Sequence, residues 1–114
     1  MDKLKIVLLF GGQSSEHEVS LTSAASIMKA IDRDHFSIVP VLIDRKGAWY
    51  WINDPDFMQR SQTKLITEKE FQGKSLVPVF LDYTRGPFLS EPYRGENRFE
   101  SRIDVIFPVL HGPF

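Results

Sequence analysis

The order of hydrophobic and polar positions predicts a buried strand at the start of the chain. Residues 4–10 (LKIVLLF) form a nearly continuous run of apolar and β-branched side chains. Such a run is typical of a strand that is covered on both faces, as in a parallel α/β sheet. Two glycines, Gly11 and Gly12, end the run. We therefore expect a strand followed directly by a turn.

After a short polar stretch the pattern becomes helical from about Ser15. Five apolar residues then follow a period of 3.6 and define one helix face: Leu21, Ala24, Ile27, Met28 and Ile31. Residues 32–34 close the helix without a glycine cap, and residues 36–43 (FSIVPVLI) predict a second strand. These elements make a right-handed βαβ unit. Pro40 argues against a central strand unless its missing N–H falls at a bulge or on an unpaired side.

The remaining pattern is less regular. Lys46 and Gly47 predict a turn that leads into an aromatic strand, and together these extend the second strand as a hairpin. Between residues 53 and 101 we expect a short helix near residues 54–60, one strand within residues 75–83 (SLVPVFLDY), and turns from residue 84 onward. Residues 103–110 predict a buried-type strand that runs into His111. The predicted fold is an α/β domain with an open, mostly parallel sheet and flanking helices.

Composition narrows the class of protein. The 114 residues have room for one domain. They are 42% hydrophobic and 25% charged, as in a soluble globular protein. No apolar window is long enough to cross a bilayer, and the first apolar run is too short for a signal peptide, so we expect a cytoplasmic protein. The chain has no cysteine, which excludes disulfides and thiolate metal sites. A net charge of -1 gives no footprint for nucleic acid or anionic lipid, which leaves small molecules or proteins as partners.

Two loops carry the candidate chemistry. In open α/β sheets, ligands bind beyond the carboxyl ends of the strands. Gly11 and Gly12 follow the first predicted strand, and His111 follows the last. If these strands are neighbours, their loops face one cleft. The alternative, which remains open at this point, is that the glycines form only a tight turn and that His111 is only a strand-end residue.

The first loop contains charges that suit an amino acid. Ser15 and Glu18 have the spacing of a capping box, which gives Glu18 a structural task. Glu16 lies beside the positive end of the helix, where a solvated glutamate is the simpler interpretation. Free N–H groups at the helix start can bind an anion. A zwitterion could therefore place its carboxylate near these groups and His111, and its ammonium near Glu16. The dinucleotide fingerprint is absent because the next glycine after Gly12 is Gly47.

Long motifs at both ends of the chain resemble one known family. The segments "KIVLLFGGQSSEHEVSLTSA" and "FPVLHGPF", supported by "VPVLIDRKGAW", resemble the N-terminal domain of D-alanine:D-alanine ligase, an ATP-grasp enzyme of peptidoglycan precursor synthesis. The resemblance implies a Rossmann-like pre-ATP-grasp domain over residues 1–114, truncated before the ATP-grasp domains. Residues 53–101 match only as a variable insertion within it.

The resemblance also implies an activity and residue roles. The family joins two D-alanines in an ATP-dependent, ADP-forming reaction through a D-alanyl phosphate, with magnesium holding the phosphates. Glu16 matches the catalytic glutamate that helps to bind the amino group of the first D-alanine, and His111 matches the histidine that contacts its carboxylate. Val19 and Ser20 lie in the segment whose backbone lines that subsite. The ATP-binding and metal-binding residues belong to later domains, so we expect none in this chain.

The resemblance leaves alternatives open. The chain ends at Phe114 before the parts that activate a carboxylate, so we expect it to be inactive alone. We expect a homodimer for the full-length ligase, and self-association of this chain through apolar surface that later domains would cover. A stand-alone amino-acid-binding or regulatory module of the same fold is one alternative. A relative that makes D-alanine:D-lactate or D-alanine:D-serine is another.

Overall fold

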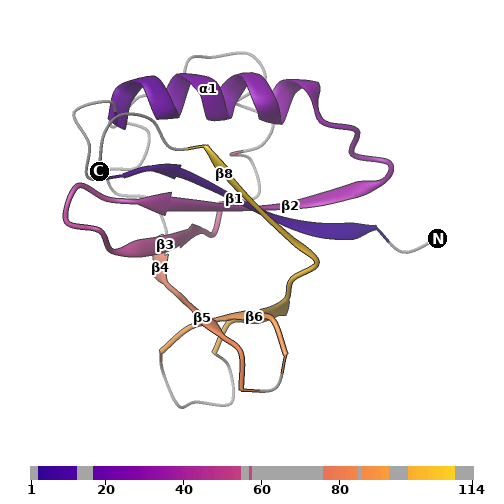
Figure 1. Ribbon diagram of the computed structural model, residues 1–114, viewed down its shortest axis with the longest axis vertical. Coiled ribbons are helices and arrows are strands. Elements are labelled where there is room, and N and C mark those ends of the chain that lie inside the picture. Colours follow the sequence, from indigo (N-terminus) through magenta and orange to yellow (C-terminus); the bar gives the residue numbers. More distant parts are fainter. Residues whose placement is uncertain are drawn as a thin grey trace.

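The structure, a computed structural model, describes residues 3–12, 17–54, 57, 76–84, 86–92 and 98–109, with the backbone alone at residues 17–19. The described residues form three layers, with a helix on one face of a five-stranded sheet and a three-stranded sheet on the other face (Figure 1). The predicted α/β class is therefore confirmed. The second sheet was not predicted.

The five-stranded sheet has the order β4-β3-β2-β1-β8. Its centre is parallel, because β1 (Leu4–Gly11) pairs in parallel with β2 (Phe36–Ile43) on one side and β8 (Val105–Val109) on the other. β3 (Trp49–Ile52) and β4 (Leu76–Pro78) extend the sheet as antiparallel strands. The sheet is open and mixed, with the predicted βαβ unit at its centre.

β1 is covered on both faces, as its sequence predicts. Residues 6–10 are at most 6% exposed. Because side chains alternate along a strand, Leu8 and Phe10 belong to the core beneath the helix, whereas Val7 and Leu9 belong to the core between the two sheets. One strand thus supplies apolar side chains to two separate cores.

Helix α1 (His17–Ala30) buries its predicted apolar face. Leu21, Ala24 and Met28 are fully buried against β1 and β2. We expected the helix to begin near Ser15; the described helix begins at His17, and the capping box of Ser15 and Glu18 lies outside the residues and side chains that the structure describes.

The end of α1 is held by side chains, as the absence of a glycine cap predicts. Arg33 Nη2 donates to the Met28 carbonyl at 3.0 Å. The Asp32 carboxylate accepts the Asp34 N–H at 2.9 Å and lies 2.5 Å from His35 Nδ1. These contacts satisfy groups at the helix end and lead the chain into β2.

The position of Pro40 in β2 fits its missing N–H. Pro40 is opposite Leu8 of β1, but the pairing of β2 with β3 begins only at Val41. The described part of β3 therefore does not need a donor at Pro40. The predicted hairpin follows, with the Asp44 N–H donating to the Ala48 carbonyl at 2.9 Å and Gly47 at a φ of 92°.

The three-stranded sheet consists of β5 (Phe80–Asp82), β6 (Phe88–Ser90) and β7 (Glu100–Arg102), all antiparallel. It corrects two predictions. Residues 75–83 are not one strand, because the chain crosses at Val79 from the large sheet to the small sheet and so packs Val79 and Leu81 between them. The segment from residue 84 onward, predicted as turns, contains β6 and β7.

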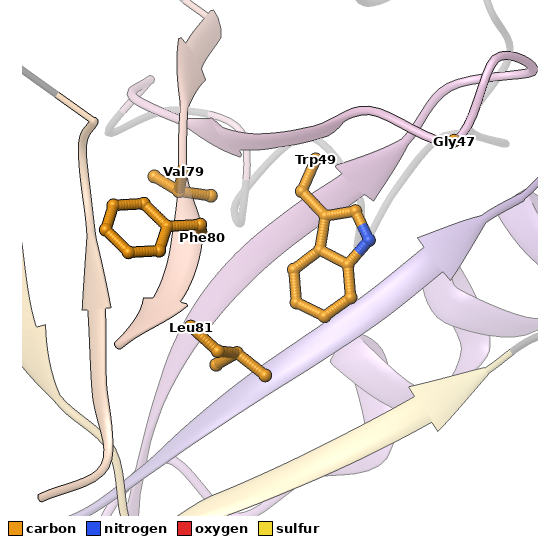
Figure 2. A pocket seen from close by; sticks show the side chains of 5 residues that line it. All are labelled: Gly47, Trp49, Val79, Phe80 and Leu81. Carbon is orange, nitrogen blue, oxygen red and sulfur yellow. The ribbon is translucent and has the colours of Figure 1, made fainter. Parts of the chain in front are cut away.

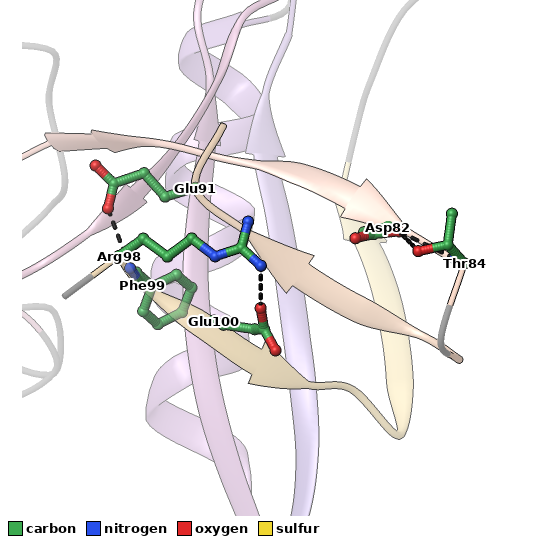
Figure 3. A network of polar contacts seen from close by, with 6 residues as sticks. All are labelled: Asp82, Thr84, Glu91, Arg98, Phe99 and Glu100. Carbon is green, nitrogen blue, oxygen red and sulfur yellow. Dashed lines mark hydrogen bonds and ion pairs between the residues drawn. The ribbon is translucent and has the colours of Figure 1, made fainter. Parts of the chain in front are cut away.

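Polar contacts hold the outer part of the small sheet (Figure 3). Arg98 Nη2 lies 2.8 Å from Glu100 Oε2, and the Phe99 N–H donates to Glu91 Oε1 at 3.1 Å. At the far end of the sheet, Thr84 Oγ1 donates to Asp82 Oδ1 at 2.7 Å. The strands of this sheet are short, and these side-chain contacts add to the backbone hydrogen bonds that join them.

The prediction of a buried-type strand near the end of the chain is wrong for most of β8. Val105 is 41% exposed and Phe107 46% exposed, and only Val109 is buried. Among the described strands β8 pairs only with β1, so it forms an edge of the sheet. An apolar run predicts a strand, but it does not reveal which neighbours cover it.

Within the short helix expected near residues 54–60, Phe57 is helical and buried. Its ring stacks on Phe10 with centroids 6.3 Å apart and planes 5° apart. Asp54 is described and is not helical, whereas residues 55, 56 and 58–60 lie outside the described part of the chain.

Candidate functional site

The carboxyl ends of β1 and β8 lie side by side. The register pairs Phe10 with Val109, the last residue of β8. The loop that contains Glu16 leaves the end of β1, and the chain continues from the end of β8 toward His111. The condition set by the sequence analysis, that these two strands are neighbours, is therefore met, and both candidate loops start from adjacent strand ends.

The backbone at the end of β1 requires the two glycines Gly11 and Gly12. Gly11 and Gly12 have φ values of 93° and 103°, in the left-handed region that glycine adopts without steric cost. Gly12 also donates its N–H to the Ile43 carbonyl at 2.8 Å, which ties the loop to the end of β2. That the glycines form a tight turn stays a prediction, because residues 13–16 lie outside the described part of the chain. Both glycines lie at the carboxyl end of β1, where open α/β sheets bind ligands.

Ser20 connects α1 to the carboxyl ends of β1 and β8. It lies at the end of the first turn of α1 and is 0% exposed. Its Oγ accepts the Gly11 N–H at 2.8 Å and donates to the Val109 carbonyl. The hydroxyl thus links the helix start to the last residues of β1 and β8.

The predicted site residues differ in what the structure describes of them. Ser20 is described in full, and its side chain bonds to backbone groups of this chain. Val19 is described as part of the α1 backbone, whereas Glu16 and His111 lie outside the described residues. The structure therefore brings Ser20 to the ends of both strands. The shared placement of Glu16 and His111 stays a prediction.

The sequence interpretation missed the role of the Ser20 hydroxyl. The signal that could have revealed it is position: Ser20 precedes Ala24 by four residues, so it lies on the apolar face of the helix. A hydroxyl on that face is buried and needs a hydrogen-bond partner.

A separate cavity of about 370 Å³ lies below the turn between β2 and β3 (Figure 2). The indole of Trp49 and the side chains of Phe80 and Leu81 border it. Its described lining, completed by Gly47 and Val79, is apolar. An apolar lining does not complement the two charges of an amino acid, so this cavity is not the predicted subsite.

A smaller hollow of about 180 Å³ lies at the opposite edge of the sheet. Lys3 precedes β1 and Phe36 begins β2, so this hollow faces the amino ends of the parallel strands. Ligands of open α/β sheets bind at the other edge. The candidate site therefore remains at the carboxyl ends of β1 and β8.

No three His, Asp or Glu side chains of the described residues form a group that could hold a metal ion. None of the helices described here combines the length and apolar character needed to cross a membrane.

Together, these features define an α/β domain with a candidate ligand site at the carboxyl ends of its parallel strands. Residues 5–114 match the family described as the D-ala D-ala ligase N-terminus. The chain belongs to this family, and the resemblance found in its motifs is confirmed.

The relatives are much longer than this chain. It is 42% identical over 113 residues to the D-alanine–D-alanine ligase of Thermoanaerobacter pseudethanolicus, with 99% of this chain but 29% of the relative covered. It is 37% identical over 120 residues to D-alanine–D-alanine ligase A of Bradyrhizobium diazoefficiens, with 98% and 29% covered. The chain thus spans less than a third of the length of these ligases.

Solved structures show the same fold. The D-alanine-D-alanine ligase of Coxiella burnetii has a TM-score of 0.72 and is 30% identical, with 96% of this chain and 29% of that chain covered. The VanG D-Ala:D-Ser ligase of Enterococcus faecalis has a TM-score of 0.70 and is 33% identical, with 97% and 30% covered. The two neighbours differ in the second substrate that their names give.

Proposed function

We propose that this chain is the N-terminal part of a D-alanine:D-alanine ligase and contributes the subsite for the first D-alanine. The family match over residues 5–114 carries the proposal. The neighbouring carboxyl ends of β1 and β8 support it, because they bring the two motif-bearing loops to one edge of the sheet. The assignment of residues 53–101 as a variable insertion remains part of the same proposal.

The proposed subsite recognises both charges of the amino acid. The Glu16 carboxylate binds the ammonium and acts as the catalytic residue of this chain, while His111 contacts the carboxylate. The first N–H groups of α1 lack partners within the helix and favour an anion. Because the Ser20 side chain already bonds to Gly11 and Val109, we assign the backbone of Val19 and Ser20, and not the hydroxyl, to the wall of the subsite.

ATP and Mg²⁺ are proposed as requirements of the longer ligase and not of this chain. Among the described residues no group of three His, Asp or Glu side chains could hold a metal ion, and the sequence has no phosphate-binding glycine motif. We assign both to the part of the ligase outside these 114 residues. When bound, ATP supplies the phosphoryl group that activates the carboxylate of the first D-alanine. The proposal also includes a cytoplasmic location and a homodimeric ligase.

The test is phosphate release from ATP in the presence of D-alanine. We expect the ligase at the length of its relatives to release phosphate and form D-alanyl-D-alanine, and the 114-residue chain to do neither. Release that requires both D-alanine and the purified 114-residue chain would overturn the assignment of catalysis to the longer protein. Absence of D-alanine-dependent release by the longer protein would overturn the ligase assignment.

A second candidate differs only in the second substrate. The likeness to a D-Ala:D-Ser ligase, at 33% identity, favours testing it directly. The same assay with D-serine or D-lactate beside D-alanine, followed by mass spectrometry of the product, separates these ligases. Specific D-alanine binding by the 114-residue chain, with no ligase activity in the longer protein, would instead indicate a stand-alone binding module.

A further inference from the structure

Ser20 is the most deeply placed polar side chain at the candidate site. It is 0% exposed and lies beside Leu21 and Ala24, which are also fully buried. A buried hydroxyl is costly unless it is hydrogen-bonded. Its two contacts therefore indicate what the hydroxyl does.

Both partners of the hydroxyl are backbone groups at strand ends. Gly11, the donor at 2.8 Å, is the last residue of β1, and Val109, the acceptor, is the last residue of β8. The described pairing of β1 and β8 ends at Phe10 and Val109. The Ser20 hydroxyl therefore adds a cross-link at the position where the described ladder between the two strands stops.

We propose that Ser20 is a positioning residue that fixes the first D-alanine subsite, an inference that rests on the proposed function. Through one hydroxyl it sets the distance between the start of the Glu16 loop and the start of the His111 segment. It does so from α1, whose N-terminal N–H groups form a third part of the subsite. The hydroxyl donates its single proton to Val109, accepts from the Gly11 N–H and is 0% exposed, so it supports the site and does not bind the substrate.

The expected effect of removing the hydroxyl follows from this placement. Ser20→Ala leaves the Gly11 N–H and the Val109 carbonyl without this partner in a buried environment. The two strand ends then shift relative to each other and to α1. A small displacement of binding groups can cost up to about 100-fold in rate. We therefore expect kcat/KM for the first D-alanine to fall by about 10- to 100-fold in the full-length ligase.

The experiment compares three variants in the full-length ligase. Ser20→Ala removes the hydroxyl, and Ser20→Thr retains it. Ser26→Ala is the matched control, because Ser26 is an exposed serine of the same helix whose hydroxyl donates only to the Thr22 carbonyl among its described contacts, at 3.4 Å. We expect Ser20→Ala to raise KM for the first D-alanine while KM for ATP stays unchanged. Ser20→Thr should restore much of the loss, and Ser26→Ala should resemble the wild type.

Hydrogen exchange tests the same proposal without measuring activity. Its first part uses the wild-type protein alone. In the wild-type ligase the Gly11 amide should exchange slowly because it donates to a buried oxygen. In Ser20→Ala, exchange should rise in the peptides that contain the two linked strand ends, residues 10–13 and 107–112. Ser26→Ala should leave both unchanged.

The outcomes that contradict the proposal are distinct from failure of the proposed function. Fast exchange of the Gly11 amide in the wild type, or faster exchange confined to α1 in Ser20→Ala, would overturn the positioning role. Equal changes in KM for D-alanine and ATP would show a general loss of structure instead. An inactive wild-type ligase would refute the ligase assignment, and the exchange experiment would still decide whether Ser20 links the two strand ends.

Discussion

The indole ring of Trp51 stacks on the ring of Phe99, with centroids 3.9 Å apart and planes 18° apart. Trp51 lies in β3 of the large sheet, and Phe99 directly precedes β7 of the small sheet. Both side chains are half-buried and pack against the core between the sheets. This pair is therefore a contact between two layers that no ladder joins.

We expect Phe99→Ala to lower the free energy of unfolding by about 1–3 kcal/mol, less than for a fully buried phenylalanine because Phe99 is half-buried. The measurement is urea denaturation followed by the fluorescence of Trp49 and Trp51, the two tryptophans of the chain. Tyr83→Ala is the control, since Tyr83 is 62% exposed and should change stability by less than about 0.5 kcal/mol. Equal effects of the two substitutions would show that the stack does not stabilise the fold.

Contacts in the loop between α1 and β2 predict that the stability of the fold depends on pH. Two hydrogen bonds lower the pKa of Asp32 below its ordinary value. The bond with the His35 side chain has the larger effect, and the bond from the Asp34 N–H has the second largest. A carboxyl whose pKa is lower in the folded state adds stability above its unfolded pKa, and this stability is lost as pH falls through the folded pKa. We expect His35→Ala to raise the pKa of Asp32, measured by NMR titration of its carboxyl carbon. Lys46→Ala, in the distant hairpin turn, should not change it, and an unchanged pKa in His35→Ala would contradict the assigned cause.

Glu16→Gln tests the proposed ammonium contact in the full-length ligase. A charge-assisted hydrogen bond is worth about 1.5–3 kcal/mol, so kcat/KM for the first D-alanine should fall by about 10- to 150-fold. KM for ATP should change little, because the proposed partner of the Glu16 carboxylate is the ammonium of D-alanine and not ATP. Asp34→Asn, at the opposite end of α1, is a matched charge-removing control. A change confined to the ATP constant would refute the role.

His111→Ala tests the proposed carboxylate contact. We expect a higher KM for the first D-alanine in steady-state kinetics, again with little change for ATP, because the histidine faces the substrate carboxylate. His35→Ala is the matched control, since His35 is exposed and lies in the loop before β2. Unaltered saturation by D-alanine in His111→Ala would count against a shared subsite.

Exposed apolar side chains at the start of β1 and along β8 predict self-association of the 114-residue chain with a second copy. Leu4, Val105 and Phe107 are 48%, 41% and 46% exposed. The register pairs Ile6 with Val105 and Leu8 with Phe107, so all three exposed side chains share one face of neighbouring strands. β8 is also the described edge of its sheet, and an edge strand can pair with another chain.

Sedimentation over a concentration series should therefore detect dimers or larger species of the 114-residue chain. We expect Phe107→Glu to reduce them, because it places a charge in the centre of this face. Phe80→Glu is the control, since Phe80 is similarly exposed, at 41%, but lies in the small sheet. A wild-type chain that stays monomeric, or an equal effect of the two substitutions, would contradict association through this face.

The strongest sequence patterns predicted the centre of the fold. The apolar run of residues 4–10 predicted β1, and the helical period of Leu21, Ala24 and Met28 predicted the buried face of α1. Both predictions are confirmed because these patterns arise from burial, and the structure buries these side chains. The small sheet was not predicted because each of its strands has three residues, too few to show a clear alternation of apolar and polar positions. In β7 the residues are Glu100, Ser101 and Arg102, which have no apolar alternation to detect.

The candidate site was predictable only as far as its motifs extend. Glu16 and His111 were selected by charge and by position after predicted strands, and β1 and β8 proved to be neighbours. The two hydrogen bonds of Ser20 could not be predicted, because one partner, Val109, is 89 residues away in the sequence. A contact over such a separation depends on tertiary pairing and not on any local pattern.

The short links between the sheets restrict where this domain can change in length. Val79 alone separates β4 from β5, and Ile103 and Asp104 alone separate β7 from β8. Asp104 is further fixed to β1, because its carboxylate accepts the Lys5 N–H at 2.7 Å and its own N–H donates to the Lys5 carbonyl at 2.9 Å. One residue inserted or deleted here would slip β8 along β1 and turn its side chains to the opposite face. A change of length at residues 103–104 would therefore move the end of β8 at Val109 relative to Gly11, the two residues that the Ser20 hydroxyl connects.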